Sequence, residues 1–160
     1  SGLLTGVFDS PASKYDRQLN QTTEKDLGMG NQRGASSEET MVERLINTAY
    51  RHFLNEKYAT AIEFLNIEGE DEISTRSTFS LYLLGASNYE LKNYIEAEKF
   101  FKMIIKDNDN IYVESSQQLL LSCFMHEKKY DKALEMMDTN PWLADTKQRK
   151  KLERTIKRHK

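Results

Sequence analysis

Cys123 and His126 are the residues whose types and spacing come closest to a catalytic pair. Three positions apart on a helix, they would share a face, and the imidazole would lie beside the thiol, as an activated cysteine nucleophile requires. However, Cys123 lies in the apolar stretch 119–124, where a buried and inert thiol is the ordinary interpretation, and no third group is evident that would orient the imidazole. We therefore expect no catalytic residues and no enzymatic activity.

Metal and cofactor sites are also not predicted. Asp107 and Asp109 start like a calcium loop, but Ile111 stands at the fifth position and Gln118 replaces the closing glutamate. The sequence contains no glycine-rich phosphate loop and no histidines at metal-ligand spacing. We expect neither a metal nor a cofactor.

The C-terminal end is strongly basic. Residues 146–160 carry eight Lys/Arg and one Glu, a net charge of +7, against −9 for the rest of a chain whose net charge is −2. The candidate anion-binding residues are Lys147, Arg149, Lys150, Lys151, Arg154, Lys157 and Arg158. RNA and anionic lipid both carry the negative charge that this segment would attract. For RNA, however, the segment lacks aromatic side chains on which bases could stack. We favour a solvated helix face and do not expect nucleic acid as the main partner.

The composition indicates one globular domain. The chain has 160 residues, of which 38% are apolar and 30% charged, and its single cysteine excludes an intrachain disulfide. No apolar run approaches the ~18 residues that a membrane span requires, so membrane contact is expected only through an anchor outside this sequence. The chain starts at Ser1-Gly2 without a methionine, which indicates an artificial boundary with an upstream signal or anchor left open. We expect a cytoplasmic location, with the bacterial periplasm as the alternative.

The elements that would position these residues follow a repeat. Ala61, Ala97 and Ala133 stand 36 residues apart, and each lies three residues after a tyrosine. A fixed period in this range is typical of stacked helix-turn-helix units, which bury their apolar faces only against one another. The sequence therefore predicts function in a surface rather than in a catalytic pocket.

Three regions are expected along the chain. Residues 1–35 hold five of the seven glycines and are predicted to be a flexible or extended lead-in. A capping box at residues 36–39 predicts the first helix from near Ser37. The second region, 36–141, is predicted to hold three helix pairs, at 37–54 with 57–67, 75–91 with 94–107, and 112–127 with 130–138. The third region, 142–160, is predicted as a capping helix that restarts at Asn140-Pro141, with Trp142, Leu143, Leu152 and Ile156 as its apolar stripe.

The middle unit resembles the tetratricopeptide repeat. Leu84-Gly85 match its Leu-Gly pair, Ala97 its small residue on the second helix, and Phe101 the large residue that fills the gap. The flanking units are more degenerate, with Leu121 at the glycine position of the third and no closing proline in any unit. The resemblance covers about residues 42–141 and implies an all-α helix-turn-helix solenoid, a tetratricopeptide-like superhelix with a C-terminal capping helix.

In that family, the first helices of successive units line a concave groove that holds a peptide or helix of a partner. The positions implied to form the partner-binding groove are Ile46, Tyr50, Phe53, Phe79, Tyr82, Tyr89 and Met125. Clustered aromatic rings are typical of binding hot spots, and the alternative is that the rings pack between adjacent helices. The positions of the family's carboxylate clamp hold Ile46, Tyr50, Leu83, Ser115 and Leu119, so binding of chaperone C-termini is not expected.

These observations predict an adaptor that binds another protein, as a peptide or helix segment, without chemistry of its own. A second hypothesis concerns the lead-in, whose apolar residues are unusual for a plain linker: Leu3, Leu4, Val7, Phe8, Tyr15 and Leu19. They would lie in the groove as an internal ligand held by a high effective concentration. One alternative is that the lead-in is a spacer from an upstream anchor, so that the chain resembles bacterial envelope proteins with soluble repeat domains. The other alternative is a module that uses its basic C-terminal helix to bind RNA or anionic lipid.

Overall fold

The computed structural model describes Tyr15 and residues 40–68 and 76–159. Within these residues all regular secondary structure is helical, without a β-strand. The elements are α2 (Met41–Leu54), α3 (Tyr58–Glu68), α4 (Thr78–Glu90), α5 (Tyr94–Lys106), α6 (Val113–His126), α7 (Tyr130–Thr139), the 3-10 helix η2 (Pro141–Leu143) and α8 (Thr146–His159). The predicted all-α fold is confirmed. Apart from Tyr15, the predicted lead-in lies outside the described residues.

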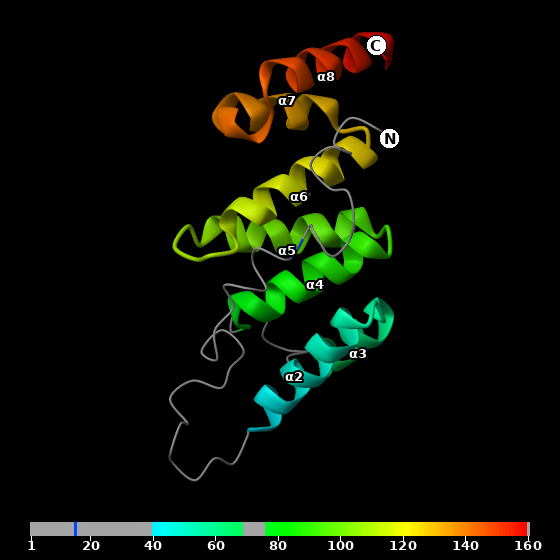
Figure 1. Cartoon of the computed structure of the whole chain (residues 1–160), viewed down its shortest axis with the longest axis vertical. Helices are drawn as coiled ribbons and strands as arrows, with labels where there is room; N and C mark the ends of the chain where they lie inside the picture. Colours follow the sequence, from blue (N-terminus) through cyan, green and yellow to red (C-terminus); the bar gives the residue numbers. More distant parts are fainter. Residues whose placement is uncertain (1–14, 16–39, 69–75, 160) are drawn as a thin grey trace.

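The helices follow one another in chain order along the long axis of the molecule, from α2 and α3 at one end to α8 at the other (Figure 1). Each α-helix packs on the next, and direct contacts also join α2 to α4 and α4 to α6. The first helices of the predicted pairs therefore lie next to one another. We call the surface built by α2, α4 and α6 the inner layer.

The position of α4 within this arrangement explains its composition. All residues from Phe79 to Tyr89 are buried, because α2, α3, α5 and α6 all contact this helix. By contrast, α2 lies at the end of the row and buries one face, through Glu43, Ile46, Ala49 and Phe53. That spacing of three or four positions is typical of a helix with a single buried stripe.

Turns of one conformation join the two helices of each pair. Glu56, Lys92 and Lys128 have positive φ angles of 58°, 64° and 58°, and they stand 36 residues apart in the sequence. The next N–H in each turn donates to a carbonyl of the preceding helix: Lys57 to His52, Asn93 to Asn88 and Lys129 to Phe124, each at 2.8 Å. This is a Schellman-type helix end. The turns fall where the sequence predicted the connections.

The start of the first described helix differs from the prediction. The capping box expected at residues 36–39 lies outside the described residues, and α2 begins at Met41 rather than near Ser37. Thr40 caps it: its side-chain oxygen accepts the N–H of Glu43 at 3.1 Å, and the Glu43 carboxylate accepts the N–H of Thr40 at 3.0 Å. Thr40 and Glu43 thus form the capping box at the start of α2.

The C-terminal helix also starts later than predicted. Asn140-Pro141 leads only into η2, while α8 begins at Thr146. Asp145 accepts the Gln148 N–H at 2.7 Å and donates its own N–H to the Gln148 side chain at 2.9 Å, so this reciprocal pair satisfies the free amides of the helix start. Of the predicted apolar stripe, Leu143, Leu152 and Ile156 are buried. Trp142 is 49% exposed and does not belong to the buried stripe.

Candidate functional site

Tyr15 occupies a site on the inner layer between α2 and α4. Its side chain is 2% exposed although the residue is remote in sequence from both helices. The ring meets Phe53 of α2 at a centroid distance of 5.2 Å and Tyr82 of α4 at 6.1 Å, with interplanar angles of 72° and 80°. Edge-on contacts of this kind are a favoured arrangement of aromatic pairs. Two helices therefore provide an aromatic site for a third segment.

The hydroxyl of Tyr15 has a charged acceptor. It donates a hydrogen bond to Oε1 of Glu90, the last residue of α4, at 2.9 Å. Burial, followed by the charge of Glu90, raises the pKa of Tyr15 well above its ordinary value. The site thus holds the neutral phenol, with the ring between two aromatic walls and the hydroxyl on a carboxylate.

The aromatic walls are held by contacts that do not involve Tyr15. The Tyr82 ring stacks on Tyr112 at 4.9 Å, and its hydroxyl lies 2.7 Å from the Ser115 hydroxyl. The Phe53 ring packs edge-on against Tyr58 at 5.5 Å. Both walls are therefore fixed by the packing of neighbouring helices, as a preformed binding site requires.

Five of the seven predicted groove residues take part in aromatic contacts. Phe53 and Tyr82 line the Tyr15 site, and Tyr50 of α2 meets Phe79 of α4 edge-on at 5.3 Å. Tyr89 binds the Ser122 hydroxyl at 2.6 Å and packs against Tyr94 at 5.5 Å. The remaining two predicted groove residues are Ile46 on α2 and Met125 on α6.

Most of the predicted groove side chains are covered. Tyr50 and Met125 are half-buried, and the buried members are Ile46, Phe53, Phe79, Tyr82 and Tyr89. The rings pack between helices or against Tyr15, which is the alternative that the sequence offered to an open groove. Binding of a partner by these positions stays a prediction.

Sequence reasoning missed the residue that receives the Tyr15 hydroxyl. Glu90 is the last residue of its helix, where a carboxylate is ordinarily solvated, and no spacing pattern links it to position 15. Tyr15 itself is among the lead-in residues that the second hypothesis places in the groove as an internal ligand. Its neighbours in the fold come from long-range packing, which a local pattern does not encode.

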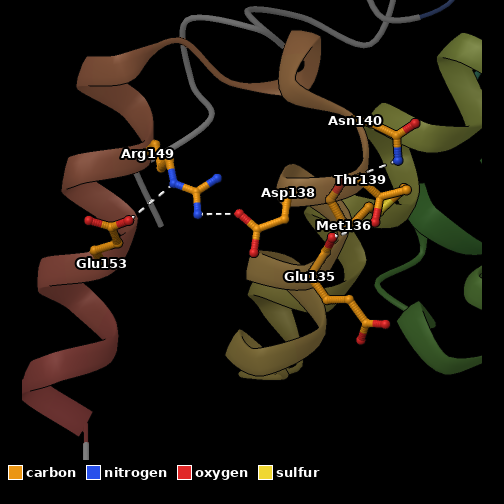
Figure 2. Close-up of polar contacts among 7 residues, drawn as sticks. All are labelled: Glu135, Met136, Asp138, Thr139, Asn140, Arg149 and Glu153. Atoms are coloured by element: carbon orange, nitrogen blue, oxygen red, sulfur yellow. Dashed lines mark hydrogen bonds and ion pairs between the residues drawn. The ribbon is translucent and has the colours of Figure 1, made fainter.

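The basic residues of α8 divide into two sets. Arg149 donates to Asp138 of α7, and its Nε lies 3.1 Å from Glu153, so this side chain is paired within the chain (Figure 2). These hydrogen bonds raise the pKa of Arg149. The other six are exposed: Lys147, Lys150, Lys151, Arg154, Lys157 and Arg158. Their spacing of three and four positions puts them on one face of α8, opposite the buried Leu152 and Ile156.

The two residues of the candidate catalytic pair differ in exposure: Cys123 is buried, whereas His126 is exposed. Cys123 is fully buried, and burial raises the pKa of its thiol far above the ordinary value, which is opposite to what a reactive cysteine needs. His126 is exposed, and its ring stacks on Tyr94 at 4.3 Å. In the described part of the chain, no three His, Cys, Asp or Glu side chains are grouped as a metal site.

Comparisons with protein-family models, curated proteins and solved structures gave no match. In the described residues, no helix combines the length and apolar character needed to cross a membrane.

Proposed function

We propose that this chain is a protein-interaction module of tetratricopeptide-like build, which receives a segment of a partner protein on its inner layer and performs no catalysis. The repeat character is supported by the three left-handed turn residues 36 positions apart and by direct contact between first helices of successive pairs. In such an array, neighbouring units share one continuous core and present an extended surface for binding.

One observation carries the proposal: the inner layer already holds a side chain from a remote segment. Tyr15 is buried between Phe53 and Tyr82, and its hydroxyl is bound by Glu90. A surface that desolvates an aromatic ring and satisfies its polar atom has the composition of a binding hot spot. Because Tyr15 is tethered, its effective concentration is of the order of mM, so weak contacts suffice to hold it in cis.

Position-specific crosslinking tests the proposal. A photoreactive amino acid is placed at Tyr50 or Met125, the half-buried side chains of the inner layer, in the organism that makes the protein. Matched control sites are Glu63 and Lys99, which are exposed on second helices. We expect one protein to be captured from the inner sites alone, followed by saturable binding of that purified protein. Equal capture from all four sites, or no capture from Tyr50 and Met125, would refute binding of a partner on the inner layer.

A second candidate function rests on the basic face of α8. Six exposed cations lie opposite the buried stripe of this helix, and none forms an ion pair with another described residue. Each Lys/Arg near an anionic bilayer contributes about 1 kcal/mol of attraction at low ionic strength. Vesicles of phosphatidylcholine with and without phosphatidylserine test this face, and a single-stranded RNA serves as the other polyanion.

Charge reversal locates the contact in that experiment. Lys150→Glu with Lys157→Glu is expected to abolish vesicle binding, whereas Lys99→Glu with Lys106→Glu, exposed on α5, leaves it unchanged. If both double variants bind equally, or if wild-type protein does not bind at low salt, this candidate is rejected. Binding to RNA with none to vesicles assigns the face to nucleic acid.

A further inference from the structure

We infer that Phe53, Tyr82 and Glu90 form a binding pocket for an unphosphorylated tyrosine side chain of a partner segment, and that Tyr15 is its occupant in cis. This inference rests on the proposed interaction function and deepens it by naming the side chain that is recognised. The three pocket residues come from two helices that contact each other directly, α2 and α4.

The shape of the pocket requires a flat aromatic ring. The two walls meet the edges and faces of Tyr15 at 72° and 80°, with centroids 5.2 and 6.1 Å away, and leave the side chain 2% exposed. Aliphatic side chains lack the ring quadrupole that favours this edge-on geometry. A ring that fills the site excludes water, and its burial supplies most of the affinity.

The carboxylate distinguishes tyrosine from phenylalanine. The phenol hydroxyl donates to Glu90 at 2.9 Å, a hydrogen bond to a charged acceptor in a part-buried site. A phenylalanine ring would cover the same carboxylate without offering a donor. A hydrogen bond to a charged acceptor contributes more than a neutral one, so the pocket favours the tyrosine ring by the donor that phenylalanine lacks.

The same carboxylate disfavours phosphotyrosine. A phosphate group brings about two negative charges at neutral pH, and it would replace the hydroxyl that lies 2.9 Å from Glu90. Among the described residues, Tyr82 and Tyr89 also act electrostatically on Tyr15, and neither phenol carries a positive charge. Phosphoryl recognition in proteins instead uses clustered Arg or Lys.

The pocket does not depend on its occupant for its shape. Tyr82 is held by Tyr112 and Ser115, and Phe53 is held by Tyr58. Removing Tyr15 therefore leaves the walls in place. A partner tyrosine then competes with Tyr15 for one site, so a chain whose position 15 has lost its ring binds the partner more tightly than wild type.

Peptide binding to the full chain with Tyr15→Ala tests the inference. The probes are synthetic peptides of residues 8–22 with tyrosine, phenylalanine, phosphotyrosine or alanine at position 15, and the dissociation constants are measured by calorimetry. We expect the tyrosine peptide to bind about tenfold more tightly than the phenylalanine peptide and at least about tenfold more tightly than the phosphotyrosine peptide. The alanine peptide is expected not to bind.

A receptor variant identifies Glu90 as the selecting group. Glu90→Gln removes the negative charge and is expected to reduce the discrimination against phosphotyrosine several-fold, whereas Glu63→Gln, an exposed site on α3, leaves it unchanged. If the peptide preferences are identical in both variants, the inference is overturned. If circular dichroism shows that Tyr15→Ala is unfolded, Tyr15→Phe serves as the receptor, with the same expected order of peptides at lower affinity.

The outcomes separate this inference from the function on which it rests. Equal binding of the tyrosine, phenylalanine and alanine peptides overturns tyrosine recognition while leaving a surface that binds segments. Tighter binding of the phosphotyrosine peptide overturns the assigned chemistry. If no peptide binds to a folded Tyr15→Ala chain, both the pocket and the interaction function that rests on Tyr15 are rejected.

Discussion

Gly85 of α4 lies directly against the ring of Phe101 in α5: a Cβ added at Gly85 would be 2.7 Å from Cε1 of Phe101. That distance is shorter than any ordinary carbon contact, so the glycine sets how closely the two helices approach. The ring fills the space that the missing side chain leaves, and Phe101 is fully buried. The other repeats use different pairs at these positions, Ala49 with Leu65 and Leu121 with Met137.

Gly85→Ala is expected to destabilise the fold. Overpacking against a fixed ring costs about 1–3 kcal/mol, and the better helix propensity of alanine offsets roughly 1 kcal/mol of this. The free energy of unfolding should therefore fall by about 1 kcal/mol, as measured by urea denaturation with circular dichroism.

The double variant Gly85→Ala with Phe101→Leu tests the cause of that loss. It copies the Ala49 and Leu65 pair of the first repeat, so the alanine methyl gains room as the ring is replaced. Phe101→Leu alone leaves a void beside the glycine and is expected to be destabilising. The double variant should be more stable than the sum of the two single effects predicts. Simple additivity would show that the two side chains are not matched.

Glycine at the left-handed turn residues is expected to stabilise the protein. Lys92 has φ of 64°, a conformation that costs an L-residue with a side chain about 1 kcal/mol and costs glycine little. Lys92→Gly should therefore raise the free energy of unfolding by up to about 1 kcal/mol. Lys102→Gly, exposed within α5, is the control and should lower it by about 1 kcal/mol. A loss of stability in both variants would contradict the role of the turn.

The helices were predictable because their signals are local and repeated. The tyrosine and alanine positions 36 residues apart fixed the phase of each pair, and the described helices end within a few residues of the predicted bounds. The helix starts were less well predicted, since Thr40 and Asp145 compete with other capping residues nearby. Several Ser, Thr, Asp or Asn residues precede the start of both helices. Which of them caps the helix depends on the position at which the buried apolar face begins.

The candidate site was only partly predictable. Phe53 and Tyr82 were identified as inward positions from the repeat phase, and the structure puts both around Tyr15. Their burial was foreseen only as an alternative, either by packing between helices or by a lead-in segment that includes Tyr15, because the sequence does not say which of the two covers each ring. Glu90 was missed for the same reason: its partner is 75 positions away in the sequence.

Loss of both hydroxyls of a hydrogen-bonded pair between α4 and α6 is expected to cost less stability than the sum of the two single losses. The Tyr82 and Ser115 hydroxyls are 2.7 Å apart in a buried site. Tyr82→Phe leaves the serine hydroxyl buried without this partner, which costs about 1–3 kcal/mol. Ser115→Ala does the same to the tyrosine. In urea denaturation, the double variant should lose less free energy of unfolding than the two single variants lose together.

A matched double-mutant cycle with Tyr89→Phe and Ser122→Ala, whose hydroxyl oxygens are 2.6 Å apart, should give a coupling energy of the same sign. Coupling energies near zero in both cycles would mean that water satisfies the remaining hydroxyls. Alanine at Tyr82 is unsuitable as a probe of partner binding, because the side chain is fully buried and its removal opens a cavity.

The stability of the fold is expected to decrease in alkaline solution through its tyrosines. Burial raises the pKa of Tyr89 from the ordinary 10.0 to about 12. The unfolded chain therefore loses this proton first, and the stabilisation, complete below pH 10, is lost as the pH rises towards 12. Each such group lowers the free energy of unfolding by about 1.4 kcal/mol per pH unit in that window. Denaturation at about pH 9 and about pH 11 should show a smaller decrease for Tyr89→Phe than for wild type. Identical decreases in the two proteins would contradict the assignment.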